Sequence, residues 1–131
     1  MPITYSIDRE KKLITEVWTG AISAEYLAAY WKRYLDDPDV LEIRSTLVDL
    51  RQAEILFRGS DLETLIQGIV LPALKGRDWK TAIVVEKSFQ FGVSRQYQAF
   101  AERYSKDAIF QDMEEARNWL IGPADSDKVS R

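Results

Sequence analysis

The chain alternates short β-branched runs with amphipathic segments, and this alternation limits it to few architectures. Two strand-like runs, 3–7 and 13–19, come first and are separated only by the polar turn "DREKK". So short a connection predicts an antiparallel hairpin. Further strand-like runs at 45–50, 80–86 and 108–110 lie between segments whose apolar residues recur at helical spacing. The order β-β-α-β-α-β-α-β-α predicts an α/β domain with four helices and a mixed sheet whose later strands are parallel.

The length of the chain suits one domain. Of its 131 residues, 46% are hydrophobic, which is enough to fill a single core. We place this domain at residues 1–121. The polar segment 122–131 that follows, "GPADSDKVSR", is predicted to be a disordered tail.

The residue types that are missing exclude most catalytic chemistry. The chain has no cysteine and no histidine, which rules out disulfides, Cys/His zinc sites, thiol nucleophiles and Ser–His relays. The stretch "FRGSD" holds a single glycine, so it forms no phosphate-cradling or dinucleotide-binding loop. The acids Glu16, Asp49, Glu54 and Asp61 show no spacing that would join two of them as an acid–base pair. We therefore predict a protein that is not an enzyme and that needs no cofactor and no metal.

Charge and hydropathy limit the partners. The net charge of −3 is spread over interleaved acids and bases, so the chain lacks the basic face that nucleic-acid binding requires. The N-terminal "MPITYSIDRE" is not a secretion signal, and no apolar run approaches the roughly 20 residues of a membrane span. We expect a cytoplasmic protein.

Two serines have the sequence context of helix caps. Ser23 precedes a helical pattern that runs as far as "DDPD", and Ser60 with Glu63 matches a capping box. In the helix predicted after Ser60, Gly68 and Pro72 should cause a kink, because proline lacks an N–H and clashes with the carbonyl four residues earlier. The pair is either a hinge that opens an apolar cleft or an irregular last turn of a core helix.

Aromatic and charged residues at the ends of two strands suggest a cleft. Phe89 and Phe91 lie in a predicted loop, "SFQFG", and Arg95 lies one turn into the next helix. The two rings either line a ligand cleft or cover the core, and Arg95 contacts either a ligand's acid or Asp49. Asp49 and Arg51 themselves are either polar anchors in the cleft or a turn cap and a surface residue.

A basic segment offers a third type of contact. Lys75, Arg77 and Lys80 flank Trp79, a grouping that suits an anionic membrane surface. The alternative is a solvated basic loop.

Four stretches, taken in order, resemble a known family. They are "GAISAE", "LVDLRQAE", "AIVVEKSFQFGVSRQY" and "IFQDMEEARNWL". In this order the chain resembles the SpoIIAA-like branch of the STAS (sulfate transporter and anti-sigma-factor antagonist) fold. The resemblance implies a protein-interaction or small-ligand-binding module. In the antagonists a serine at the start of the second helix is phosphorylated to control partner binding, and SpoIIAA-like relatives have been suggested to bind apolar ligands or membranes.

The sequence departs from the antagonist pattern at the phosphorylated position. When Asp49 is placed on the strand's acid, the Asp-Ser pair of the pattern falls on Phe57 and Arg58, beside Gly59. Ser60 lies two residues further on. It is either a displaced switch, where a phosphate would meet the helix N-terminus, or only an N-cap.

The leading hypothesis is therefore a non-enzymatic module that holds an apolar or amphiphilic ligand between the sheet and the second and third helices. Its predicted ligand-binding residues are Trp18, Phe57, Phe89, Phe91 and Tyr97 as walls, with Arg95 as the polar contact. The alternatives are a regulatory-protein switch at Ser60 and peripheral membrane association. A homodimer through an apolar helix face is a further expectation.

Overall fold

The structure, a computed structural model, describes residues 1–122 and has one five-stranded sheet. The strands are β1 (Ile3–Asp8), β2 (Leu13–Ile22), β3 (Ser45–Ile55), β4 (Trp79–Val84) and β5 (Ser105–Phe110), and they lie side by side in chain order. β1 and β2 are antiparallel and all other neighbours are parallel. The predicted hairpin and mixed sheet are confirmed. Of the predicted tail, residues 123–131 lie outside the described residues.

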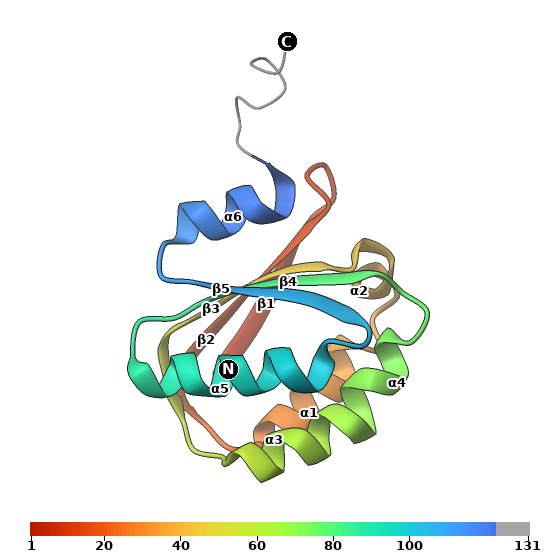
Figure 1. Cartoon of the computed structure of the whole chain (residues 1–131). Coiled ribbons are helices and arrows are strands. Elements are labelled where there is room, and N and C mark those ends of the chain that lie inside the picture. Colours follow the sequence, from red (N-terminus) through yellow and green to blue (C-terminus); the bar gives the residue numbers. More distant parts are fainter. Residues whose placement is uncertain (123–131) are drawn as a thin grey trace.

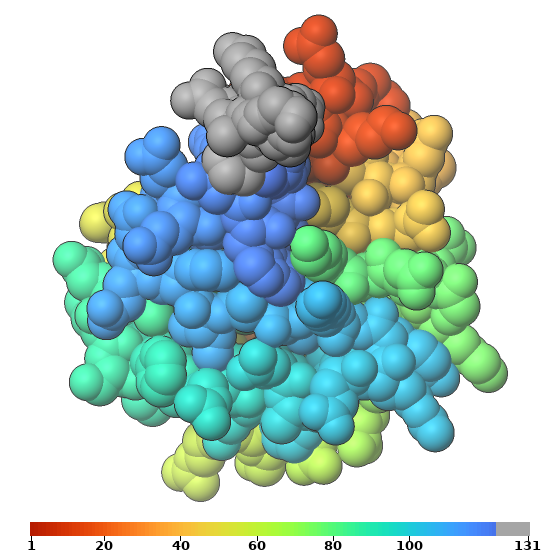
Figure 2. Space-filling model, turned by 45° about the horizontal axis from the view of Figure 1, so that its top comes forward, coloured from red at the N-terminus to blue at the C-terminus, as the bar shows by residue number. Residues whose placement is uncertain are grey.

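Helices cover the two faces of the sheet unequally (Figure 1). One face carries α1 (Ala24–Tyr34), the consecutive segments α3 (Gly59–Leu65), η1 (Ile66–Val70) and α4 (Leu71–Leu74), and α5 (Ser88–Ala101). The other face carries α6 (Met113–Ile121), which shares its side of the molecule with the tip of the β1–β2 hairpin (Figure 2). The main core therefore lies between the sheet and the first helical layer, and a smaller cluster lies under α6.

A short helix that the sequence did not predict follows α1. The "DDPD" stretch ends α1 and then begins α2 (Pro38–Ile43), so four helices were too few. Asp37 caps α2, because its Oδ1 accepts from the backbone N–H of Asp39 at 2.9 Å, and Pro38 occupies a first-turn position where no N–H is needed. The helix ends at Arg44, which has a φ of 58°.

The predicted cap of α1 is confirmed and that of α3 is wrong. Ser23 Oγ accepts from the N–H of Tyr26 at 3.1 Å. At α3, however, Arg58 is the N-cap residue, and Asp61 Oδ2 accepts from its N–H at 3.0 Å. Ser60 is exposed within the first turn. Asp61 thus has the role predicted for Glu63, since the helix starts two residues earlier than predicted.

β3 extends to Ile55, beyond the predicted Leu50, and contains a bulge. Val17 pairs with Asp49 and Thr19 with Gln52, so Leu50 and Arg51 together oppose Trp18. The extra residue inverts the alternation of side chains along the strand. Consequently "LVDLRQAEI" lacks the regular alternation of apolar and polar residues that would predict a single strand.

Phe89 and Phe91 belong to the first turn of α5, not to a loop. The buried Gln90 fixes this start: its Oε1 accepts from the N–H groups of Glu86 at 2.8 Å and Lys87 at 3.1 Å, and its Nε2 donates to the Ala53 carbonyl at 3.0 Å. The two phenylalanines flank Gln90 on the outer side and are 57% and 43% exposed. They do not cover the core.

The interruption expected at Gly68 and Pro72 takes the form of a π-helical turn, η1. The N–H of Leu71 donates to the carbonyl of Ile66, five residues earlier. Pro72 lies in the first turn of α4 and supplies no N–H to the carbonyl of Gly68. The backbone hydrogen bond therefore spans five residues here instead of four. The side chains after this turn are rotated about the helix axis relative to those before it.

Candidate functional site

A cavity of about 70 Å³ lies between the sheet and the helical layer. Its walls come from β2, β3 and β4 on one side and from α1, α3, η1, α4 and α5 on the other. Aromatic rings dominate the lining: Trp18, Trp31, Tyr34, Phe57, Trp79 and Tyr97. Leu62, Val70 and Leu74, from the interrupted helical segment, contribute an aliphatic wall.

A buried carboxyl group lies at one wall. Glu16 is 3% exposed, and its two oxygens accept from Trp18 Nε1 at 2.9 Å and from the Tyr30 hydroxyl at 2.6 Å. Burial raises the pKa of Glu16, and the two hydrogen bonds only partly offset that effect. No lysine or arginine is among the described residues that line the cavity.

Most of the remaining polar groups are hydroxyls. Those of Tyr34 and Thr46 lie 2.7 Å apart and bond to each other. Burial raises the pKa of both Tyr34 and Tyr97, so both phenols remain neutral. Ser94 Oγ is different: it is buried at the cavity and has no hydrogen-bonding partner among residues 1–122.

A second, half-buried acid lies behind the Thr81 side of the cavity. Asp107 on β5 pairs with Thr81 across the sheet and accepts from Ser105 Oγ at 2.6 Å. Burial raises its pKa to about 6, against hydrogen bonds from Ser105 and Thr81. Its Oδ2 has no partner among the described residues. Asp107 does not line the cavity.

The structure brings together only half of the residues predicted to bind a ligand. Trp18, Phe57 and Tyr97 line the cavity, whereas Phe89, Phe91 and Arg95 do not. Arg95 is exposed, with its guanidinium carbon 5.7 Å from the centre of the Phe91 ring. The last three residues therefore form an outer surface of α5, separate from the cavity.

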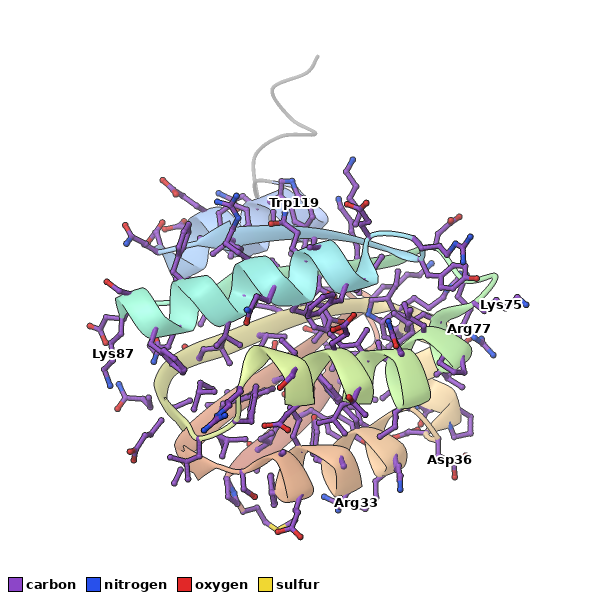
Figure 3. The ribbon with its side chains drawn as sticks, turned by 60° about the horizontal axis from the view of Figure 1, so that its bottom comes forward. Arg33, Asp36, Lys75, Arg77, Lys87 and Trp119 are labelled. Atoms are coloured by element: carbon purple, nitrogen blue, oxygen red, sulfur yellow. The ribbon has the colours of Figure 1, made fainter. Side chains whose placement is uncertain are left out.

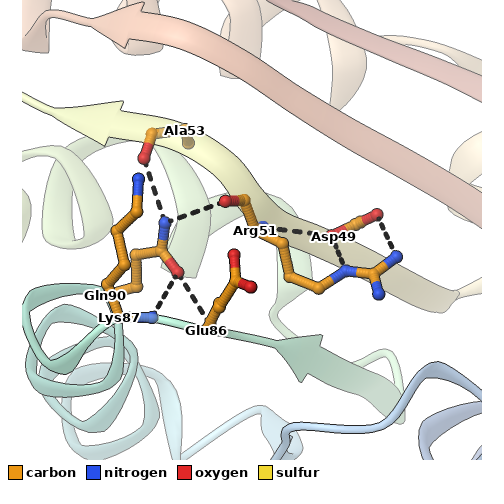
Figure 4. A network of polar contacts seen from close by, with 6 residues as sticks. All are labelled: Asp49, Arg51, Ala53, Glu86, Lys87 and Gln90. Carbon is orange, nitrogen blue, oxygen red and sulfur yellow. Dashed lines mark hydrogen bonds and ion pairs between the residues drawn. The ribbon is translucent and has the colours of Figure 1, made fainter.

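Asp49 and Arg51 pair with each other across the β3 bulge (Figure 4). Arg51 Nε and one guanidinium NH₂ group each lie 3.0 Å from a carboxylate oxygen, and the Arg51 N–H adds a third bond of 3.0 Å. Burial alone would raise the pKa of Asp49, but these bonds hold it below its usual value. The predicted contact between Arg95 and Asp49 is absent among the described residues, and neither Asp49 nor Arg51 lines the cavity.

The basic segment around Trp79 does not form one cluster on the surface. Trp79 is buried and lines the cavity. Lys75 and Arg77 point outward from the end of α4 (Figure 3). Lys80 Nζ donates to the Trp119 carbonyl at 3.1 Å, on the α6 side of the sheet. Within residues 1–122, no helix is both long and apolar enough to span a bilayer.

Sequence reasoning missed several residues at the cavity, above all Glu16, Trp31, Trp79 and Ser94. One signal could have identified Glu16: in "LITEVW" it occupies the inward-facing alternate position between Ile14 and Trp18. Both of these neighbours are buried. An acid at such a position is a candidate buried group.

Comparisons with known proteins identify the fold. No protein-family model and no curated protein matches the sequence. Among solved structures, an uncharacterized protein from the DUF3478 family with a SpoIIAA-like fold, from Shewanella loihica PV-4, is similar at a TM-score of 0.62 and 19% identity. The match covers 90% of this chain and 93% of that chain. The resemblance noted in the sequence is thereby confirmed at the level of architecture: the chain has a SpoIIAA-like fold.

Proposed function

We propose that the protein is a non-enzymatic, cytoplasmic binding module that holds an apolar or amphiphilic small ligand in the cavity between the sheet and the helical layer. The observation that carries this proposal is the cavity itself. Protein interiors are normally packed as densely as organic crystals, yet six aromatic side chains here surround about 70 Å³. A mostly apolar cavity with a few polar groups is the usual form of a small-molecule site.

The size of the cavity implies that its wall moves. An engineered apolar cavity of about 150 Å³ holds benzene, whereas this one measures about 70 Å³. A slender aliphatic group fits, but a larger ligand needs more room. The segment with the least regular backbone, η1, contributes Val70 to the wall. We propose that Gly68 and Pro72 are the hinge that lets this wall shift.

Tryptophan fluorescence provides the test, because three of the four tryptophans line the cavity. Trp119 lies on the other face of the sheet, next to Phe110 (Figure 3). Trp119→Phe therefore leaves only reporters that line the cavity. Titration of this variant with 1-octanol should change the emission saturably, and native mass spectrometry should detect a one-to-one adduct.

Two variants show where the probe binds. Val70→Leu adds a methylene to the cavity wall and should weaken octanol binding. Ala99→Val makes a similar addition at an exposed position of α5 and should leave binding unchanged. If octanol neither changes the emission nor forms an adduct, the binding proposal fails.

A partner-controlled switch is the second candidate, and the exposure of Ser60 favours it. Its side chain lies in the first turn of α3, makes no cap and is open to a kinase. A pull-down from lysate with Ser60→Asp and Ser60→Ala should then recover different partners. Identical sets of captured proteins would exclude the switch.

A further inference from the structure

The unpartnered hydroxyl of Ser94 gives the cavity a specific polar point. Ser94 is 1% exposed, and it lies on the inner side of α5, one turn before Tyr97. A serine inside a helix can bond back to the carbonyl four residues earlier, but here Oγ makes no such bond. A buried hydroxyl without a partner is destabilising, because it has lost its hydrogen bonds to water. A polar atom in the cavity would recover part of that cost.

The carboxyl group and the other hydroxyls of the cavity are already paired. Glu16 has a donor at each oxygen, from Trp18 and Tyr30. The Tyr34 and Thr46 hydroxyls satisfy each other. Ser94 is thus the group in the described lining that most needs a partner.

The lining also excludes charged groups of either sign. An anionic head group would be buried beside the Glu16 carboxyl with no lysine or arginine in the described lining to neutralise it. A cationic group would have to displace donors that Glu16 already holds at 2.9 and 2.6 Å. An uncharged hydroxyl or carbonyl meets neither obstacle.

We infer that the part of the ligand that enters the cavity is uncharged, slender and aliphatic, and that it carries one hydroxyl or carbonyl oxygen bonded to Ser94 Oγ. This inference rests on the proposed ligand-binding function and names the class of ligand. It also replaces Arg95, which lies outside the cavity, as the polar contact. The hydroxyl of Ser94 can donate to a carbonyl and can both donate to and accept from an alcohol.

The experiment compares three probes that have the same chain and different head groups. 1-Octanol, octanoate and octylammonium are titrated at pH 7 into the Trp119→Phe protein, with emission and native mass spectrometry as readouts. The titrations are repeated with Ser94→Ala and with Ser88→Ala, an exposed serine at the start of the same helix. Octanol should bind at least tenfold more tightly than either charged probe. Ser94→Ala should weaken octanol roughly tenfold, as expected for one buried hydrogen bond, and Ser88→Ala should not.

The outcomes distinguish the assignment to Ser94 from the proposed ligand-binding function. Octanoate that binds as tightly as octanol would show that the head group stays outside, and octylammonium that binds more tightly would point to an ion pair with Glu16. Octanol affinity unaffected by Ser94→Ala would mean that water alone satisfies the hydroxyl. Each of these results overturns the assignment to Ser94 and leaves the binding function intact. Failure of all three probes to bind rejects both.

Discussion

The half-buried acid Asp107 should make the stability of the protein depend on pH in a direction opposite to that of most carboxylates. Burial raises its pKa from 3.8 to about 6, although Ser105 and Thr81 donate to it. The native state therefore binds the proton more tightly than the unfolded state does. By linkage, the free energy of unfolding falls as the pH rises from about 4 to about 6. At about 1.4 kcal/mol for each pH unit, the loss amounts to roughly 3 kcal/mol.

Asp107→Asn tests this reasoning, because it keeps the shape of the side chain and removes the titration. Urea unfolding, followed by tryptophan fluorescence, gives the free energy of unfolding of both proteins between pH 3.5 and 8. The two values should be similar at pH 3.5. The variant should then become more stable than the parent as the pH rises, by up to about 3 kcal/mol at pH 7.5. Burial also raises the pKa of Glu16. Because Glu16 is present in both proteins, its contribution cancels in the difference between their free energies of unfolding.

The test is how the difference in the free energy of unfolding between Asp107→Asn and the parent changes with pH. A stability difference that is constant from pH 3.5 to 8 would refute the argument, as would a variant less stable than the parent at pH 7.5. Asp36→Asn, at an exposed position between α1 and α2, controls for the loss of one negative charge from the chain.

Three further predictions concern the helices and the cavity wall. Ser23→Ala should lower the free energy of unfolding by about 1 kcal/mol because it removes the cap of α1, whereas Ser60→Ala should change it by less than about 0.5 kcal/mol. Equal losses in urea unfolding would restore a capping role for Ser60. Tyr30→Phe should cost about 1–3 kcal/mol, since one oxygen of the buried Glu16 loses its donor; an unchanged thermal midpoint would contradict this. Gly68→Ala, where an added Cβ meets nothing within 4 Å, should add about 0.5–1 kcal/mol and slow hydrogen exchange in η1. Unchanged exchange there would argue against the hinge.

The arrangement of the fold could be predicted because its signals are local. The hairpin follows from a short polar turn between two β-branched runs, and the cap of α1 from Ser23 next to an amphipathic pattern. Features that depend on contacts with another element have no local signal in the sequence. Gln90 starts α5 by bonding to the backbone of β3 and of its own N-terminus, so "SFQFG" resembles a loop when read alone. The bulge opposite Trp18 likewise depends on the pairing of β2 with β3.

The candidate site was predictable only in part, for a related reason. Trp18 and Phe57 are large, apolar and close to strands, and such residues usually enter the core. Glu16 and Ser94 have no such pattern, because their burial depends on partners and packing from other elements. Glu16 is held by the Tyr30 hydroxyl from α1. The charge of Arg95 and its place after a strand predict a site residue, whereas the turn of α5 directs its side chain to solvent.

The order of strands in the sheet bears on how the cavity comes into being during synthesis. The strands are neighbours in both the sheet and the sequence. Each new strand can therefore pair with the exposed edge of the strand before it, and only short loops have to close. The cavity cannot close at this stage, because Ser94 and Tyr97 arrive only with α5, after four of the five strands. A nascent chain that ends before residue 88 would expose the aromatic wall to water. The segment from residue 88 onward thus completes the cavity, because α5 covers an aromatic surface that the earlier elements leave exposed.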